Sequence, residues 1–324
     1  MKNSINQIGV KKTISLIIHT KNEEKNIRAC INSAKKIADE ILIIDMHSTD
    51  KTVFLAKKLG AQVISVDDHT VVEMVRNFGM SKARSEWILS LDADERLTKK
   101  LVQKILEIVD ENQYDIVQFP FKNILFDKWI EHTGWWPDYH PRLIRKGYLV
   151  WSNSALAHCP PILKGRILTL EPKEINAVIH YNIVSVDQFL QKMSRHIGKD
   201  TFFDKNELTT TNVLNYINGQ FKWRFFDQKG YLDGTHGYVL SKFMEFYWFL
   251  HFVKYWESRH YPDFIDQEIL MDNMYIRYTK YNSVKSILKL FKYYLPRIKY
   301  LLAHKVITCS QRTKKLLINC LHSN

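Results

Sequence analysis

Short apolar runs alternate with amphipathic stretches from Thr13 to about Phe121. The apolar runs are nearly continuous, as expected for strands that are buried on both faces of a sheet: Ile14–Ile18, Ile41–Ile44, Val63–Val66, Trp87–Leu91 and Ile116–Phe121. The stretches between them have helical character: Glu24–Ala38, Thr52–Leu59, Val72–Ala83 and Thr98–Asp110. This alternation predicts an α/β fold with a mostly parallel sheet and helices on both faces.

The alternation stops after Phe121. Residues 122–205 mix Trp, His, Pro and Gly with strand-like pieces such as Tyr148–Trp151 and Ala177–Tyr181, and we interpret them as an elaboration of the same domain. From about residue 206 the chain becomes aromatic and basic, with helical periodicity. We therefore expect one α/β domain over residues 1–205 and a helical extension over residues 206–324.

Polar residues follow three of the predicted strands where each strand ends. They occupy residues 20–23, residues 45–50 and the segment Asp92-Ala93-Asp94-Glu95. The carboxyl ends of parallel strands meet at one edge of a sheet, which is where ligands bind. Each motif alone is equally typical of a cap or a turn. Three of them at one edge favour a ligand site.

The carboxylates of Asp92 and Asp94 are two residues apart, which places them on the same side of an extended segment. Carboxylates beside a nucleoside diphosphate are useful when a hard cation, Mg²⁺ or Mn²⁺, lies between the negative groups. That cation also stabilises a leaving diphosphate. Asp45 follows an apolar strand and is placed to accept hydrogen bonds from a base or a ribose. The pattern predicts a metal-assisted nucleotide-sugar site.

Four motifs, at residues 17–24, 41–52, 76–80 and 89–95, resemble in order and spacing the family 2 glycosyltransferases of the GT-A fold. The branch that includes the lipopolysaccharide core β-1,4-glucosyltransferases is the most similar. The resemblance covers roughly residues 13–200. It implies a nucleotide-sugar half over about 13–121, an acceptor half over about 122–205, and inverting transfer of a sugar from a UDP-sugar, with glucose suggested by the branch.

The resemblance also implies roles for single residues. Thr20, Glu23, Asp45 and Arg76 would contact the nucleotide, Asp92 the nucleotide or sugar, and Asp94 the metal. His47 replaces the small residue more usual before Ser-Thr-Asp, which leaves base recognition open.

Inverting transfer needs a base that removes the proton of the acceptor hydroxyl. Asp138, in the aromatic segment 134–143, matches the family's acceptor loop and is the candidate, and we expect burial to raise its pKa. The alternative is a turn aspartate, and Glu131 and His132 are weaker candidates.

The same segment supplies predicted acceptor contacts. These are Trp135 and Trp136, as a platform for a sugar ring or as core residues, and Arg142, as an anion contact or a surface residue. His180, in Val-Ile-His-Tyr, resembles the later histidine that completes the metal shell in many GT-A enzymes. A structural role for His180 stays open, and His158 is a weaker candidate.

Charge and composition indicate the partners and the cellular compartment to expect. The formal net charge is +13, and residues after Asp272 carry 11 basic residues and no acidic one. No nucleic-acid-binding motif accompanies this excess, so no nucleic-acid partner is expected. Cysteine spacing indicates neither disulfides nor zinc, and the absence of a signal-peptide pattern favours the cytoplasm.

The segment Tyr238–Trp256 is apolar on all sides but carries charges, which favours burial or an interfacial position over a membrane span. Val284–Leu295 has an apolar face opposite lysines. We expect peripheral binding to an anionic membrane on its cytoplasmic face, with packing on the catalytic domain as the alternative.

The sequence therefore predicts a metal-assisted inverting glycosyltransferase that acts on a lipid-linked or lipopolysaccharide-type glycan. Two other functions remain open. A sugar-phosphate nucleotidyltransferase has a similar sheet but needs a glycine-rich phosphate loop after its first strand, which residues 20–24 lack. A non-catalytic membrane adaptor would retain the fold without the chemistry.

Overall fold

A computed structural model describes residues 12–67, 73–151, 160–197 and 209–260, together with residue 263 and residues 266–271. The chain divides into two compact units. The first comprises residues 1–208 and 212–262, and the second comprises residues 209–211 and 263–324. The second unit is described only at residues 209–211, 263 and 266–271, of which 267–271 are helical. The fold below belongs to the first unit.

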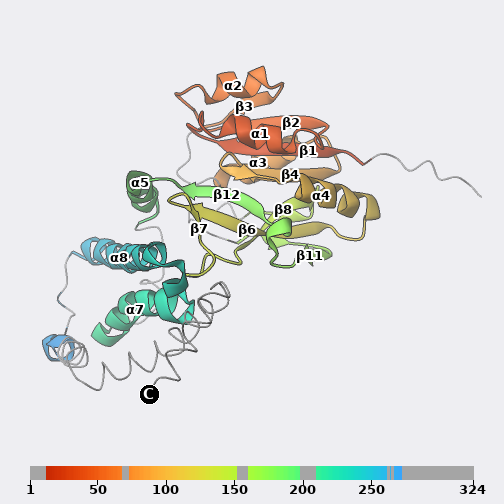
Figure 1. The fold of residues 1–324 in the computed structure, drawn as a ribbon. Coiled ribbons are helices and arrows are strands. Elements are labelled where there is room, and N and C mark those ends of the chain that lie inside the picture. Colours follow the sequence, from red (N-terminus) through yellow and green to blue (C-terminus); the bar gives the residue numbers. More distant parts are fainter. Residues whose placement is uncertain are drawn as a thin grey trace, which may run out of the picture. The chain divides into compact units, whose positions relative to one another are not determined.

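One large sheet organises the first unit, with strand order β3-β2-β1-β4-β8-β6-β12-β5 (Figure 1). Its first half is parallel and consists of β1 (Ile14–Thr20), β2 (Glu40–Asp45), β3 (Gln62–Ser65) and β4 (Trp87–Asp92). Because β1 lies between β2 and β4, the residues that follow these strands meet at one edge, as the sequence predicts.

The second half of the sheet departs from parallel order. Strand β8 (Tyr139–Arg145) is inserted antiparallel between β4 and β6 (Ile116–Leu125). Strand β12 (Val178–Ile183) then runs parallel to β6, and the short β5 (Glu95–Arg96) pairs antiparallel with β12. Pairing of β5 with β12 brings the end of the Asp92–Glu95 segment beside His180.

Short strands complete the sheet at its margins. β11 (Ile167–Thr169) pairs parallel with β6, and β7 (Lys128–Trp129) folds back on β6 as an antiparallel hairpin. β9 (Leu149–Val150) and β10 (Ile162–Leu163) form a separate two-stranded sheet.

Helices cover both faces of the sheet, as expected. α1 (Ile27–Ala34), α2 (Thr52–Lys58) and α4 (Lys99–Glu111) contribute to one apolar core, and α3 (Glu73–Lys82) contributes to the other. Alternate residues of β1 enter opposite cores: Leu16 and Ile18 the first, Ile17 the second. The predicted cap at Thr98 is present, since its hydroxyl accepts a hydrogen bond from the Leu101 amide at 3.1 Å.

A third core joins α8 (Thr235–Ser258) to the second half of the sheet. Leu240 of α8 is fully buried in a cluster with residues of β6, β12 and α5 (Val186–His196). α7 (Thr210–Lys222) precedes α8 and is joined to it by two short helical turns, η2 (Trp223–Asp227) and η3 (Gly230–Asp233). Residues 212–260 thus share a core with the α/β domain, while a domain boundary at residue 205 stays a prediction.

No helix in the described part of the chain combines the length and apolar character that crossing a membrane requires. The amphipathic segment Val284–Leu295 lies outside the described residues.

The carboxylate of Asp233 ties the turn before α8 to the loop after β7. It accepts hydrogen bonds from the backbone amides of Glu131 and His132 at 3.3 and 3.1 Å, and from the hydroxyl of Thr133 at 2.8 Å. Its backbone carbonyl accepts one from the ammonium group of Lys128 at 2.7 Å. A buried carboxylate with this many donors fixes the course of residues 131–133, which lead into the acceptor loop.

The start of α8 passes so close to this turn that a side chain cannot fit. A Cβ atom on Gly237 would overlap the backbone carbonyl of Gly230. We expect Gly237→Ala to lower the free energy of unfolding by about 1 to 3 kcal/mol, because one of the two backbones must shift. Urea unfolding followed by circular dichroism measures the change.

Gly219→Ala is the matched control, since Gly219 lies within α7 and has no atom within 4 Å of a built Cβ. It should stabilise the protein by about 0.5 to 1 kcal/mol through reduced backbone entropy. Equal stability of the two variants would show that the Gly230–Gly237 approach is not tight in solution.

Candidate functional site

Asp92, the last residue of β4, is held between two buried arginines. Arg76 of α3 donates to both carboxylate oxygens at 2.8 and 3.0 Å, and Arg142 of β8 donates to Oδ2 at 3.2 Å. Arg142 in turn makes two hydrogen bonds to the fully buried carboxylate of Glu95, at 2.7 and 2.9 Å. Four charged side chains from α3, β4, β5 and β8 therefore form one continuous chain of ion pairs.

The arginines decide the ionisation of Asp92. Burial alone would raise the pKa of this carboxyl, but the charges of Arg76 and Arg142 hold it well below its usual range. For Arg142, burial acts to lower the pKa, and the neighbouring carboxylates of Glu95 and Asp92 raise it above its ordinary value. Asp92 is therefore ionised at neutral pH and presents a fixed negative charge at the sheet edge.

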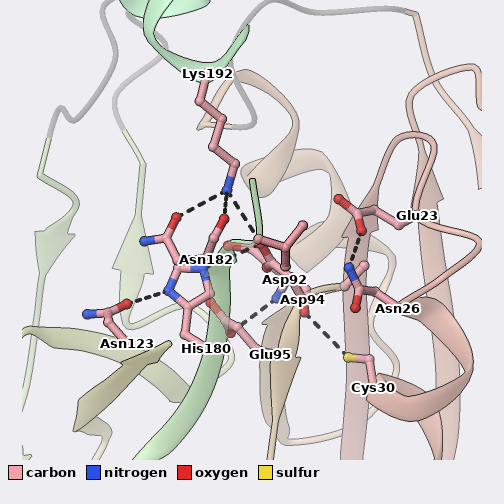
Figure 2. Close-up of polar contacts among 12 residues, drawn as sticks. Glu23, Asn26, Cys30, Asp92, Asp94, Glu95, Asn123, His180, Asn182 and Lys192 are labelled. Atoms are coloured by element: carbon pink, nitrogen blue, oxygen red, sulfur yellow. Dashed lines mark hydrogen bonds and ion pairs between the residues drawn. The ribbon is translucent and has the colours of Figure 1, made fainter. Parts of the chain in front are cut away.

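Asp94 lies beside His180 and Lys192 (Figure 2). Its Oδ2 is 3.5 Å from Nε2 of His180 on β12 and 3.7 Å from Nζ of Lys192 on α5. Burial opposes ionisation of both Asp94 and His180, yet their mutual attraction lowers the pKa of Asp94 and raises the pKa of His180. Lys192 also donates to the backbone and side-chain oxygens of Asn182 at 2.5 and 3.1 Å, which fixes its ammonium group above the site.

The ends of β1 and β2 carry two buried oxygen atoms that have no hydrogen-bond partner among the described residues. They are Oγ1 of Thr20 and Oδ1 of Asp45, whose Cα atoms are paired in the sheet register. The other oxygen of Asp45 accepts from the Ser48 amide at 3.1 Å. Buried polar atoms without partners are costly, so this pair indicates a place where a ligand supplies the missing hydrogen bonds.

Arg76 and Glu23 complete the donor-side surroundings. Nε and Nη1 of Arg76 are buried without a partner in the described chain, and its guanidinium lies 5.1 Å from the ring centre of Trp151. Glu23 accepts from the Asn26 side chain at 2.8 Å. Burial, and then the charge of Asp94, raises the pKa of Glu23.

Asp138 differs from the expectation in its protonation. Burial acts to raise its pKa, but the hydrogen bond and charge of His140, with Nε2 at 3.1 Å from Oδ1, lower it below the ordinary value. The prediction of a raised pKa is therefore wrong. Asn123 adds a hydrogen bond to Oδ2 at 3.3 Å. Asp138 is ionised at neutral pH, which is the state in which a carboxylate can accept a proton.

The predicted acceptor residues are distributed over different surroundings. Trp135 packs against the third core, and Trp136 meets Trp129 edge-on with ring centres 5.4 Å apart. Both tryptophans are partly buried. Arg142 is buried within the ion-pair chain described above. The N–H groups of Arg142 donate hydrogen bonds to Glu95 and Asp92. Its role as a contact of the sugar acceptor stays a prediction.

The weaker candidates are two alternatives for the base, which lie in the loop bound by Asp233, and one alternative for the metal ligand. Glu131 is exposed, and its backbone amide is bound to Asp233. His132 binds the same carboxylate through its amide and through Nδ1 at 3.2 Å. His158 lies outside the described residues.

A divalent cation would find two suitable side chains here. Asp94 and His180 approach each other closely enough to act as ligands of one ion. Within the described residues, however, no group of three or more His, Cys, Asp or Glu side chains is arranged to hold a metal. Mg²⁺ commonly binds through one or two protein carboxylates and takes its other ligands from water and substrate phosphates. The donor set therefore fits a cation that binds together with a diphosphate.

The sequence analysis assigned no individual role to Glu95, Asn123 or Lys192, which make contacts at the site. Glu95 directly follows Asp94 in the sequence, so its position could have indicated that it belongs to the site. Asn123 and Lys192 are far from that motif in the sequence and reach it only through the pairing of β6 with β12 and the return of α5.

His19 lies next to Asp92 in the register of β1 and β4. It is buried, and a Cβ on Gly79 would lie 2.8 Å from its Nε2, so it is closely packed against α3. Burial, together with the charge of Arg76, lowers the pKa of His19 to about 3. The imidazole is therefore neutral in the folded protein at neutral pH.

Comparison with known proteins finds a family match for the part of the chain that carries most of these residues. Residues 15–163 match the family model Glycosyl transferase family 2. An uncharacterized glycosyltransferase of Rickettsia bellii is 29% identical over 257 residues, which cover 75% of this chain and 86% of the relative. One from Rickettsia typhi is 27% identical over 292 residues, covering 86% and 96%. Together with the α/β sheet, the family match confirms the GT-A fold class.

Solved structures give more distant matches. Staphylococcus aureus TarS is 19% identical, with a TM-score of 0.40, and the match covers 63% of this chain and 40% of TarS. Glucosyl-3-phosphoglycerate synthase from Mycobacterium tuberculosis, in a complex with Mn²⁺ and UDP, is 22% identical with a TM-score of 0.30. That match covers 35% of this chain and 43% of the synthase.

The neutral state of His19 predicts a pH-dependent stability. The unfolded chain binds a proton at this residue near pH 6.5, while the folded chain does so only near pH 3. Unfolding therefore takes up a proton between these values, and stability falls as the pH is lowered through this window, by at most about 1.4 kcal/mol per pH unit from this group. Urea unfolding from pH 7 to pH 4.5 measures the slope.

His19→Asn removes the titrating group and should make the slope shallower, whatever its effect on stability at pH 7. A slope identical to that of the wild type would show that His19 is not held neutral.

Proposed function

Because the chain is a glycosyltransferase that carries a family 2 domain over residues 15–163, we propose that it transfers a sugar from a UDP-sugar with inversion at the anomeric carbon. The observation that carries this proposal is a pair of oxygens, on Thr20 and Asp45, that find no hydrogen-bond partner in the described part of the chain and lie at the same sheet edge as the acidic segment at the end of β4. A nucleoside diphosphate supplies both the hydrogen-bond donors that this pair lacks and the charge that an acidic segment can bind through a cation.

The nucleotide occupies the edge formed by β1 and β2. Asp45 Oδ1 and Thr20 Oγ1 bond to the base or ribose, and the free donors of Arg76 face the diphosphate. Glu23 borders the same space, and Asp92, fixed by its two arginines, faces the ribose or the donor sugar. In this arrangement Arg76 serves two purposes, since it both fixes Asp92 and attracts the anionic ligand.

Asp94 and His180 would hold the divalent cation, Mg²⁺ or Mn²⁺, together with the diphosphate oxygens. When bound, such a cation would supply positive charge to stabilise the leaving diphosphate. Lys192, whose ammonium group lies 3.7 Å from Asp94, adds a positive charge from α5 at the same place.

Asp138 is the base. The acceptor hydroxyl attacks the anomeric carbon, a new C–O bond forms, and the bond to the diphosphate breaks with its electron pair leaving on the diphosphate oxygen. The hydroxyl proton passes to a carboxylate oxygen of Asp138. The lowered pKa of Asp138 keeps this carboxylate ready to accept the proton, and His140 fixes its orientation at 3.1 Å.

The acceptor side is the part of the proposal that depends most on motif resemblance. Trp135 and Trp136, close to Asp138 in the sequence, would contact a sugar ring of the acceptor, and Arg142 would be a further acceptor contact. The lipopolysaccharide-core motifs suggest a lipid-linked or lipopolysaccharide-type glycan as acceptor and glucose as the transferred sugar. The sugar-phosphate nucleotidyltransferase alternative predicts release of pyrophosphate instead of UDP.

Two substitutions separate the donor half from the acceptor half. Asp94→Ala should weaken Mn²⁺-dependent binding of UDP by about 10-fold or more, because it removes a proposed ligand of the cation. Asp138→Asn should preserve that binding but lower kcat for transfer by at least about 100-fold, because the amide cannot take the proton. Calorimetry with UDP and Mn²⁺, and UDP release from a panel of nucleotide sugars, give the two readouts.

Unchanged transfer by Asp138→Asn would remove it as the base. If the wild-type protein binds and hydrolyses none of the nucleotide sugars with either cation, the whole proposal fails.

Membrane binding is the second part of the proposal. α8 exposes aromatic side chains on its outer side, among them Phe246 and Phe249, which are 47% and 43% exposed and stacked on each other. Lys242 and Lys254 lie on the same helix. Both lysines also form ion pairs with glutamates of α8, so the exposed aromatic rings are the main argument for contact with the headgroup region of a membrane, where a lipid-linked acceptor would be found.

Flotation of the full chain with liposomes tests this part. The protein should float with vesicles that contain anionic lipid and less with neutral ones, and the double variant Phe246→Ser, Phe249→Ser should float less because it loses apolar contact. Phe54→Ser is the control, since Phe54 is 63% exposed on α2. Equal flotation of all three proteins would place the membrane contact elsewhere.

A further inference from the structure

Asn123 links the two halves of the candidate site through one fully buried side chain. It lies on β6, next to His180 in the register with β12. Its Oδ1 is 2.8 Å from Nδ1 of His180, while its Nδ2 is 3.1 Å from the carbonyl oxygen of Trp135 and 3.3 Å from Oδ2 of Asp138. Figure 2 shows Asn123 and His180 joined from neighbouring strands, with Asp94 on the other side of the imidazole.

The partners of Asn123 fix the orientation of its amide. A backbone carbonyl and an ionised carboxylate can only accept hydrogen bonds, so the NH₂ group must face Trp135 and Asp138. The carbonyl oxygen of the amide then faces His180 and can only accept. Nδ1 of His180 must therefore carry a proton.

This assignment decides what Nε2 can do. When the ring is neutral and its proton is on Nδ1, Nε2 has a lone pair 3.5 Å from Asp94, and a cation shared by the two residues could bind there in place of the proton that the imidazolium carries. Without Asn123, the nearby carboxylate would favour the opposite tautomer, with a proton on Nε2 and no lone pair for the cation. A hydrogen bond to the second nitrogen of a ligating histidine commonly fixes its tautomer in metal sites.

We propose that Asn123 is a positioning residue that sets the tautomer of His180 on the donor side and, through its NH₂ group, the orientation of Asp138 on the acceptor side. This inference rests on the proposed roles of His180 and Asp138. One rigid amide then fixes the distance between the group that holds the leaving diphosphate and the group that accepts the hydroxyl proton.

Two variants separate the two tasks of Asn123. Asn123→Leu has a similar volume and removes both hydrogen bonds. Asn123→Asp retains an acceptor for His180 Nδ1 but loses the donor to Trp135 and Asp138. Asn176→Asp is the matched control, because the Asn176 side chain is only partly buried and donates to the Glu171 carbonyl at 3.1 Å, away from the candidate site.

The first readout needs no metal and no substrate. Nitrogen-15 NMR of histidine-labelled protein reports which ring nitrogen carries the proton, and the His180 signals are assigned by their loss in His180→Gln. Wild type, Asn123→Asp and Asn176→Asp should show a protonated Nδ1 at a pH where the ring is neutral. Asn123→Leu should show the Nε2-protonated form or a mixture.

The second readout is binding and turnover. Asn123→Leu should weaken Mn²⁺ binding in the presence of UDP by about 10- to 100-fold, the usual cost of removing an outer hydrogen bond from a ligating histidine. Asn123→Asp should bind Mn²⁺ and UDP like the wild type but lose at least about 10-fold in kcat, with little change in KM for the donor. Asn176→Asp should match the wild type in both.

An Nδ1-protonated His180 in Asn123→Leu, or unchanged Mn²⁺ affinity and kcat in both variants, would overturn the inference. If Asn123→Leu does not fold, a wild-type kcat in Asn123→Asp overturns the acceptor-side part. Absence of Mn²⁺ and UDP binding by the wild type would instead contradict the proposed function, while the metal-free NMR measurement would still decide the tautomer.

Discussion

The buried ion-pair chain Arg76–Asp92–Arg142–Glu95 is the constraint on which the site depends. Carboxylates at the ends of parallel strands repel one another and are costly to bury. Without positively charged side chains nearby, the strand ends would separate or the carboxylates would become protonated. Two guanidinium groups from opposite directions remove this conflict. They also join a helix of the donor half to a strand of the acceptor half, so the charges that define the edge hold the two halves together.

The acceptor half is fixed from two sides. From within the sheet, Asn123 and the backbone of β6 hold Asp138. From the C-terminal helices, Asp233 fixes the loop that leads into the same segment. The turn before α8 thus helps to hold the segment that leads to Asp138. The side chain of Asp138, the proposed base, is fixed in orientation although the residue belongs to no helix or strand.

The sequence predicted those features that depend on local patterns. Alternation of apolar and amphipathic runs gave the parallel half of the sheet, Thr98 gave the cap of α4, and the rule of strand ends brought Asp45, Asp92 and Asp94 to one edge. The antiparallel insertion of β8 was not predicted, because it depends on pairing between distant strands. For that reason Arg142 was expected at the acceptor surface, whereas its side chain lies buried among carboxylates.

Ionisation was the least predictable property, because it depends on partners that periodicity does not reveal. Asp138 is only partly buried, with its side chain 37% exposed, and His140, two residues away, reverses the effect of burial on its pKa. Lys192 and Asn123 entered the site through strand pairing and helix return, and no local signal marks either of them. Residue type and spacing identified the acidic residues at the sheet edge. The cationic side chains and the amide that neutralise and orient these residues could be located only in the three-dimensional structure.

The close approach of Gly237 to Gly230 also bears on how such enzymes can be recombined. Because backbone meets backbone there, the start of α8 and the turn before it must be inherited together with the loop that Asp233 binds. A chimera that exchanges C-terminal helices between relatives has to take its junction after this contact, beyond residue 241, or transfer the loop with it. The smallest segment that can be exchanged therefore includes the loop, the turn before α8 and the start of α8.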